Sequence, residues 1–131
     1  MKTLIVEDDF TSRLLLQEIL RRHGSSHVAV NGREAVDAVR AALAAGAPYD
    51  LVCLDIMMPE MNGQEALLRI RQLEEESGIE VWRRAKVIMT TALADRANVI
   101  EAIAGQCDSF LVKPIGRIKL IEELRRLGLI P

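Results

Sequence analysis

The sequence predicts an α/β fold in which a doubly wound parallel sheet of five strands carries helices on both faces. Two observations support this fold class. Five short apolar runs of strand-forming residues recur along the 131 residues, and the segments between them have apolar residues at helical spacing. Alternation of strands and helices is typical of parallel sheets covered on both faces. Right-handed crossovers between the strands then make the sheet doubly wound.

The first two strands are expected near the start of the chain. Residues 4–6 form the first strand and lead directly into the acidic run 7–9. A helix is expected from about residue 11, with Gly24 as its C-terminal stop. Residues 27–30 form the second strand. A second helix, with apolar residues four apart, follows and ends where glycine and proline appear.

The third strand belongs to residues 50–63, a stretch that begins with strand-forming apolar residues and ends in loop chemistry. Asp55 stands where the apolar run stops. After Gly63 a third helix is expected, and it closes in the acidic run 74–76, which is predicted to be a solvated helix end. Residues 77–85 either extend this helix or form an ordered loop.

Residues 87–89 form the fourth strand and residues 110–112 the fifth. A helix is expected between them, at about residues 95–104. A last helix follows the fifth strand and ends near Gly128. Since no linker or repeat interrupts this pattern, residues 1–131 are expected to form one domain without an appended output domain.

Polar side chains stand at the ends of four strands: Glu7 and Asp8 after the first, Asp55 at the third, Thr91 at the fourth and Lys113 after the fifth. In a doubly wound sheet these carboxyl ends surround one crevice. Converging carboxylates repel one another, and a hard divalent cation such as Mg²⁺ relieves that repulsion. A lysine and a hydroxyl that face the same cation suit a phosphoryl group.

Four blocks of the sequence resemble the signature motifs of response regulator receiver domains. They are Val-Glu-Asp-Asp at 6–9, Leu-Asp-Ile-Met-Met-Pro-Glu-Met-Asn-Gly at 54–63, Thr-Ala at 91–92 and Phe-Leu-Val-Lys-Pro at 110–114. The resemblance covers nearly the whole chain, in order. It implies the flavodoxin-like (βα)5 fold with strand order 2-1-3-4-5. It also implies that the protein is a phosphoacceptor in a two-component phosphorelay. Phosphorylation would then switch the surface formed by the fourth helix, fifth strand and fifth helix for partner binding.

The resemblance also implies roles for the acidic residues. Asp55 is the phosphoacceptor, and Asp8 is a direct ligand of Mg²⁺, the implied cofactor. Glu7 resembles the acid that holds the metal through water. The backbone carbonyl of Met57 completes the ligands that the protein supplies.

The remaining site residues are assigned in the same way. Thr91 resembles the hydroxyl that senses the phosphoryl group, Lys113 the lysine that contacts its oxygens and Phe110 the aromatic switch residue. Thr90 competes for the hydroxyl role. Successive strand residues point oppositely, and Thr91 is preferred because it is the one followed by alanine. The family resemblance also implies a cis peptide bond after Lys113.

The segment from Glu74 to Lys86 departs from the family pattern because it is several residues longer than usual. It contains Trp82, which is expected to pack locally. A further expectation concerns the lifetime of the phosphoryl group. Met57 and Leu93 lie two residues after the acceptor and the switch hydroxyl, and both are apolar and bulky, so they are expected to hinder the water that hydrolyses the phosphate.

The partners follow from the resemblance: a histidine kinase or histidine phosphotransfer protein as phosphodonor, and an unknown downstream protein. The chain would be a phosphoacceptor regulator and not an enzyme. A net charge of −2 makes no case for nucleic acid, and the apolar runs are too short to cross a membrane. No signal peptide or cysteine metal spacing is present, so a cytoplasmic protein with reduced thiols is expected.

Two other functions fit the same topology. One is a phosphorylation-independent docking module that keeps the fold but not the chemistry. Degenerate receivers are expected to lose the acidic pair, the acceptor or the lysine, and this chain has them all. The other is a flavin-binding electron carrier, which needs a phosphate-cradling loop after the first strand. The acidic run 7–9 would repel that phosphate, so this function is set aside.

Overall fold

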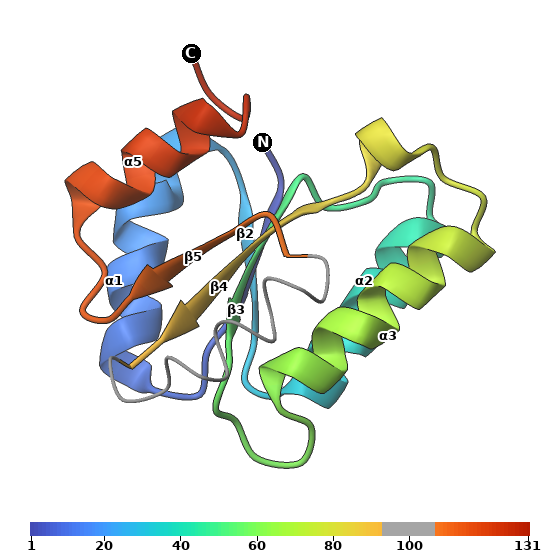
Figure 1. The fold of residues 1–131 in the computed structure, drawn as a ribbon, viewed down its shortest axis with the longest axis horizontal. Coiled ribbons are helices and arrows are strands. Elements are labelled where there is room, and N and C mark those ends of the chain that lie inside the picture. Colours follow the sequence, from blue (N-terminus) through green and yellow to red (C-terminus); the bar gives the residue numbers. More distant parts are fainter. Residues whose placement is uncertain (93–106) are drawn as a thin grey trace.

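The computed structural model of the protein describes residues 1–92 and 107–131 (Figure 1). Its centre is a sheet of five parallel strands, namely β1 (Thr3–Val6), β2 (Ser26–Ala29), β3 (Leu51–Asp55), β4 (Lys86–Thr91) and β5 (Ser109–Val112). The strands lie in the order β2-β1-β3-β4-β5. The predicted fold class and strand order are therefore confirmed.

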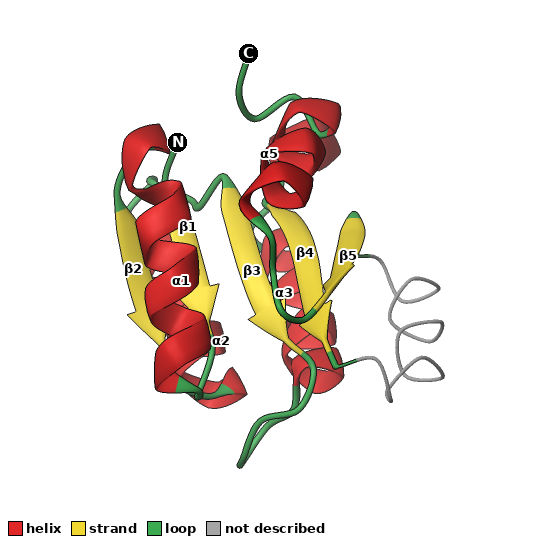
Figure 2. Ribbon diagram, turned by 90° about the vertical axis from the view of Figure 1, so that its left-hand side faces the viewer, coloured by secondary structure: helices red, strands yellow, loops and turns green. Residues whose placement is uncertain are grey.

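Helices cover both faces of the sheet. The described residues contain α1 (Phe10–Leu20), α2 (Gly32–Ala44), α3 (Gly63–Glu76) and α5 (Arg117–Arg126). Helices α1 and α5 lie on one face, and α2 and α3 lie on the other (Figures 1 and 2). The helix predicted at about residues 95–104 lies outside the described residues. None of the described helices is long and apolar enough to cross a membrane.

The core explains why the strands are visible in the sequence as apolar runs. All residues of β1 and β3 are buried. Leu4 of β1 packs with the core on the α2–α3 side, and the next residue, Ile5, packs with the core on the α1–α5 side. This alternation is the period of two that a strand imposes on its side chains. A strand buried on both faces therefore consists largely of apolar residues.

The long connection after α3 is an ordered loop and not an extension of the helix. It contains a short 3₁₀ helix, η2 (Val81–Arg83). Helix α3 ends at Glu76, and Gly78 follows with a positive φ of 71°. That backbone conformation suits glycine and ends a helix readily.

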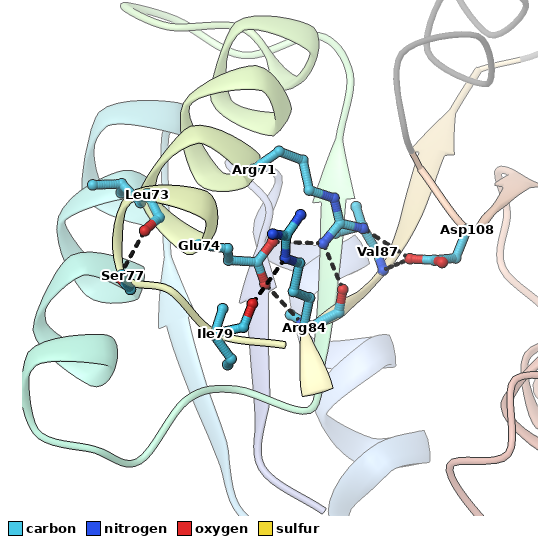
Figure 3. A network of polar contacts seen from close by, with 9 residues as sticks. Arg71, Leu73, Glu74, Ser77, Ile79, Arg84, Val87 and Asp108 are labelled. Atoms are coloured by element: carbon cyan, nitrogen blue, oxygen red, sulfur yellow. Dashed lines mark hydrogen bonds and ion pairs between the residues drawn. The ribbon is translucent and has the colours of Figure 1, made fainter. Parts of the chain in front are cut away.

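Two predictions for this region were wrong. Trp82 does not pack against the protein, because 73% of its surface is exposed. Glu74 does not belong to a solvated helix end, because it is only 2% exposed. Its carboxylate is buried because it accepts hydrogen bonds from Arg71 and from the backbone N–H of Ala85 (Figure 3). The other two acids of the run, Glu75 and Glu76, are exposed as predicted.

Candidate functional site

The acidic side chains come together because β1 and β3 are adjacent parallel strands in register. Val6 pairs with Leu54, so Glu7 and Asp55 follow on neighbouring strands at the same edge of the sheet. One carboxylate oxygen each from Glu7, Asp8 and Asp55 lies within 4.8 Å of the others. Glu7 and Asp55 are buried, whereas Asp8 is exposed to solvent. The predicted convergence of the three acids at the carboxyl ends of the strands is therefore present.

Lys113 enters this crevice from the end of β5. Its ammonium nitrogen lies 2.6 Å from Oε1 of Glu7 and 3.3 Å from Oδ2 of Asp55. Its backbone N–H donates to the carbonyl of Thr91 at 2.7 Å, which extends the pairing of β5 with β4. The peptide bond between Lys113 and Pro114 is cis, as predicted. One cation thus contacts two of the three acids.

The burial and charges of the crevice shift the pKa values of Asp55 and Lys113. Burial raises the pKa of Asp55 to about 7, and the nearby Glu7 carboxylate adds to this shift, while Lys113 opposes it. Burial alone would lower the pKa of Lys113, but its hydrogen bond to Glu7 and the charges of both carboxylates raise it instead. Three carboxylates against one ammonium leave an excess of negative charge at this edge of the sheet.

The turn from β1 to α1 fixes the backbone that carries the first two acids. The side chain of Asp9 accepts a hydrogen bond from the N–H of Ser12 at 2.9 Å and so caps α1. Hydrogen bonds from Ser12 also lower the pKa of Asp9. Arg13, which the sequence analysis did not single out, donates to the backbone carbonyl of Glu7 at 3.2 Å. An arginine six residues after an acid carries no motif that would have revealed this contact.

The loop after β3 is held against the phosphoacceptor position by glycine. A Cβ on Gly63 would lie 2.2 Å from the carbonyl oxygen of Asp55, so only glycine permits this approach. The N–H of Gly63 donates to the carbonyl of Ile56 at 2.8 Å. Asn62 and Glu65 then form a capping box that starts α3. The loop between β3 and α3 carries Met57, which is 58% exposed.

The predicted switch residues occupy the neighbouring strands. Thr91 is buried at the end of β4, and its hydroxyl donates to the carbonyl of Ala92 at 3.1 Å. Phe110 pairs in register with Met89 and is 39% exposed. Thr90 is also buried, so the choice of Thr91 as the sensing hydroxyl stays a prediction.

His27 lies away from the acidic crevice. His27 belongs to β2, and its Nδ1 lies 2.7 Å from the hydroxyl of Tyr49. Tyr49 precedes β3 and therefore stands at the amino end of the sheet. Cys53 is buried within β3, and burial raises the pKa of its thiol to about 12, which makes the thiol unreactive.

The donor set of the crevice fits a hard divalent cation. Its ligand atoms are carboxylate oxygens, which Mg²⁺ and Ca²⁺ prefer. Burial raises the pKa of Asp55 most, and repulsion from the Glu7 carboxylate adds to the shift; a bound cation would offset that repulsion. Asp8 is exposed and has no hydrogen bond or ion pair among the described residues, so its oxygens are available for a ligand.

Comparison with known proteins agrees with this geometry. A family model described as the response regulator receiver domain matches residues 3–125. The chain is 34% identical over 129 residues to the chemotaxis protein CheY of Thermotoga maritima, with 97% of each chain covered.

Solved structures also show the same fold. The receiver domain of the Saccharomyces cerevisiae response regulator Ssk1, crystallised with the histidine phosphotransfer protein Ypd1, is similar with a TM-score of 0.82 and 26% identity, over 98% of this chain and 88% of that chain. The receiver domain of the Arabidopsis thaliana histidine kinase CKI1, complexed with Mg²⁺ and BeF₃⁻, is similar with a TM-score of 0.77 and 27% identity, over 95% and 89%. The chain therefore belongs to the response regulator receiver domain family.

Proposed function

We propose that Asp55 accepts a phosphoryl group from the phosphohistidine of a histidine kinase or a histidine phosphotransfer protein. The observation that carries this proposal is the meeting of Asp55, two further acids and Lys113 at one edge of the sheet. An oxygen of the Asp55 carboxylate attacks phosphorus, the phosphorus–nitrogen bond breaks, and the imidazole leaves with the electron pair of that bond. The product is an aspartyl phosphate.

The side chains around Asp55 favour this transfer. Lys113 approaches Asp55 closely enough to contact the new phosphoryl oxygens, and a cation there stabilises their charge. Glu7 and Asp8, the carboxylate of Asp55 and the backbone carbonyl of Met57 would hold Mg²⁺, with Glu7 acting through water. When bound, Mg²⁺ supplies positive charge to the phosphoryl oxygens.

Relatives support these partners and this cofactor. The receiver domain of Ssk1 forms a complex with a histidine phosphotransfer protein, and that of CKI1 binds Mg²⁺ together with BeF₃⁻. By analogy the protein would take its phosphoryl group from such a donor. It would act as a phosphoacceptor regulator rather than an enzyme, with residues 1–131 as one receiver domain. Its two free cysteines agree with a cytoplasmic location.

Phosphorylation would be transmitted to a downstream protein through β5 and α5, together with the fourth helix expected from the sequence. Thr91 would move toward the phosphoryl group, and Phe110 would turn from its exposed position into the space that is vacated. Such a switch is a shift between two populations, and phosphate acts through its different affinity for the two states.

The test is to incubate the protein with Mg²⁺ and acetyl phosphate and to locate the acyl phosphate by mass spectrometry. We expect one labelled residue, Asp55, and no labelling of Asp55→Asn. Asp37→Asn, which removes an exposed acid from α2, is the control and should be labelled like the wild type. Labelling of Asp55→Asn at the wild-type level would refute the assignment, and no labelling of any variant would favour a phosphorylation-independent docking module.

A further inference from the structure

The connection between α3 and β4 lies at the opposite end of the sheet from Asp55 (Figure 1), and buried charges hold it in place. Glu74 accepts a hydrogen bond from Arg71 at 2.8 Å and another from the N–H of Ala85 at 2.8 Å. Arg71 also donates to the carbonyl of Ala85 at 2.8 Å (Figure 3). The end of the connection is therefore fixed to the helix by both backbone groups of one residue.

The same network reaches the beginning of β5. Arg71 donates to Oδ2 of Asp108 at 2.9 Å, and that oxygen also accepts from the N–H of Val87 at 2.7 Å. Glu74 is buried and Asp108 is partly buried, and each acid thus accepts hydrogen bonds from Arg71 and from a backbone N–H. Because the connection is anchored to α3, β4 and β5, its conformation is set before any partner arrives.

A cavity of about 220 Å³ lies beside this connection. Its lining residues are Arg71, Val81, Arg84, Ala85, Lys86 and Asp108. Arg84 and Lys86 have no ion pair with any residue in the described part of the chain. Within residues 1–92 and 107–131, the guanidinium of Arg84 donates to the carbonyl of Ile79 at 3.4 Å and to no acid. The acid in the cavity lining, Asp108, is paired with Arg71, and Glu80 does not line the cavity. Arg84 and Lys86 are therefore the two lining cations without an acidic partner in the described part of the chain.

Two exposed apolar side chains belong to the same connection, and one of them, Val81, also lines the cavity. Val81 is 74% exposed and Trp82 is 73% exposed, both on η2. Aromatic and arginine side chains together are characteristic of the energetically important centres of protein interfaces. Since the network fixes Ala85, two residues after η2, little conformational freedom would be lost when these side chains are covered.

We propose that this surface, formed by Val81, Trp82, Arg84 and Lys86, docks an acidic segment of a partner protein. A carboxylate of that segment would enter the cavity between the two cations, and an adjacent apolar side chain would cover Val81 and Trp82. Charge complementarity selects an acidic partner over a basic one. The surface does not include Asp55 or its neighbours, so docking here is independent of the phosphorylation proposed above.

The experiment uses the single tryptophan as its reporter. A synthetic peptide of alternating glutamate and leucine is titrated into the protein while the fluorescence of Trp82 and the amide NMR shifts of residues 79–86 are followed. The control peptide has lysine in place of glutamate. We expect saturable binding of the glutamate peptide, shifts centred on residues 79–86, weakening by salt and no binding of the lysine peptide.

Variants separate the contributions of charge and apolar surface. Lys86→Met and Arg84→Met should each weaken binding about tenfold, as the loss of one charge-assisted contact predicts. Arg22→Met, which removes an exposed cation outside the cavity lining, should bind like the wild type, and so should Asp55→Asn. Trp82→Ala, followed by NMR alone, should also weaken binding, and its exposed side chain makes a folding defect unexpected.

Several outcomes would overturn the proposal. These are no saturable binding at millimolar peptide, equal binding of the lysine peptide, and unchanged binding by Lys86→Met and Trp82→Ala. Concentration-dependent self-association that Trp82→Ala abolishes would assign the surface to a second copy of the chain instead. Binding of vesicles of anionic phospholipid without binding of the peptide would assign it to a membrane.

Discussion

Lys113 is held more closely by Glu7 than by Asp55. Its ammonium nitrogen lies 2.6 Å from Oε1 of Glu7, whereas Oδ2 of Asp55 lies 3.3 Å away. Glu7 is completely buried, so this lysine is the cation that compensates its charge in the metal-free protein. The residue that would contact the phosphoryl group therefore also stabilises the crevice before phosphorylation.

Lys113→Met is expected to destabilise the metal-free protein. Buried Glu7 would lose its cation, and a buried carboxylate left without its cation typically costs about 3 to 5 kcal/mol of unfolding free energy. Mg²⁺ should restore part of the loss because it binds only the folded state. Urea denaturation in EDTA and in Mg²⁺ measures both effects. Lys119→Met removes an exposed lysine of α5 and should change stability little; equal losses in the two variants would contradict this role for Lys113.

The stability of the metal-free protein should depend on pH through Asp55. Its pKa is raised from 3.8 to about 7 in the folded state. Between these values the folded protein binds more protons than the unfolded chain, so stability should fall by a few kcal/mol as pH rises from about 4 to about 7 and then level off. Asp55→Asn should lack this fall and be more stable than the wild type at pH 8.

The comparison is made by urea denaturation at several pH values in EDTA. Adding Mg²⁺ should reduce the fall, because a bound cation favours the carboxylate. If Asp55→Asn shows the same pH dependence as the wild type, another group is responsible.

Gly63→Ala should disturb the crevice without touching its charges. The new Cβ would lie 2.2 Å from the Asp55 carbonyl oxygen and 2.8 Å from Cα of Ile56, so the backbone must move. Overpacking of this kind costs about 1 to 3 kcal/mol. We also expect slower labelling by acetyl phosphate. Gly116→Ala is the matched control, because a Cβ there meets nothing within 4 Å; it should leave labelling unchanged, and a similar defect in both variants would refute the steric explanation.

The sequence was sufficient to predict the sheet and the position of the crevice. Residues 51–54 are recognisable as a strand because they form an apolar run, which burial on both faces favours, and all residues of β3 are buried. Glu7, Asp55 and Lys113 were predicted to converge because parallel strands end at one edge. Their closeness to one another depends on side-chain geometry, so the preference of Lys113 for Glu7 could not be predicted.

Glu74 shows the limit of pattern reasoning. It begins a run of three acids, which normally indicates solvent exposure. Its burial depends on Arg71 one turn earlier and on the N–H of Ala85, eleven residues later. The contact with Ala85 forms only because the connection between α3 and β4 returns to the end of α3, and no sequence motif predicts that path. For the same reason the exposure of Trp82 was missed, since a large aromatic residue is normally expected to pack.

Arg71→Met should be strongly destabilising. Glu74 is only 2% exposed, and removing its cation leaves a buried carboxylate uncompensated, which typically costs about 3 to 5 kcal/mol. Arg69→Met is the control on the same helix. Arg69 donates to Gln72 at the exposed surface, so its loss should cost less than about 0.5 kcal/mol. Equal midpoints of urea denaturation for the two variants would show that the network makes no net contribution to the stability of the folded protein.

The last prediction concerns the lifetime of the phosphoryl group on Asp55. The side chain of Met57 is 58% exposed and lies two residues after Asp55. It is apolar, so it cannot orient a water by hydrogen bonding. Met57→Asn supplies a side chain that can, and it keeps the backbone carbonyl proposed as a metal ligand. One hydrogen bond made in the transition state corresponds to hydrolysis about tenfold faster.

The measurement is loss of phosphate from Asp55 in excess Mg²⁺ after the phosphodonor is removed. Met57→Leu keeps the apolar character and should decay at the wild-type rate, which separates polarity from size. If Met57→Asn decays no faster than Met57→Leu, this side chain does not control access of the hydrolytic water, and the lifetime is set by the backbone groups around Asp55.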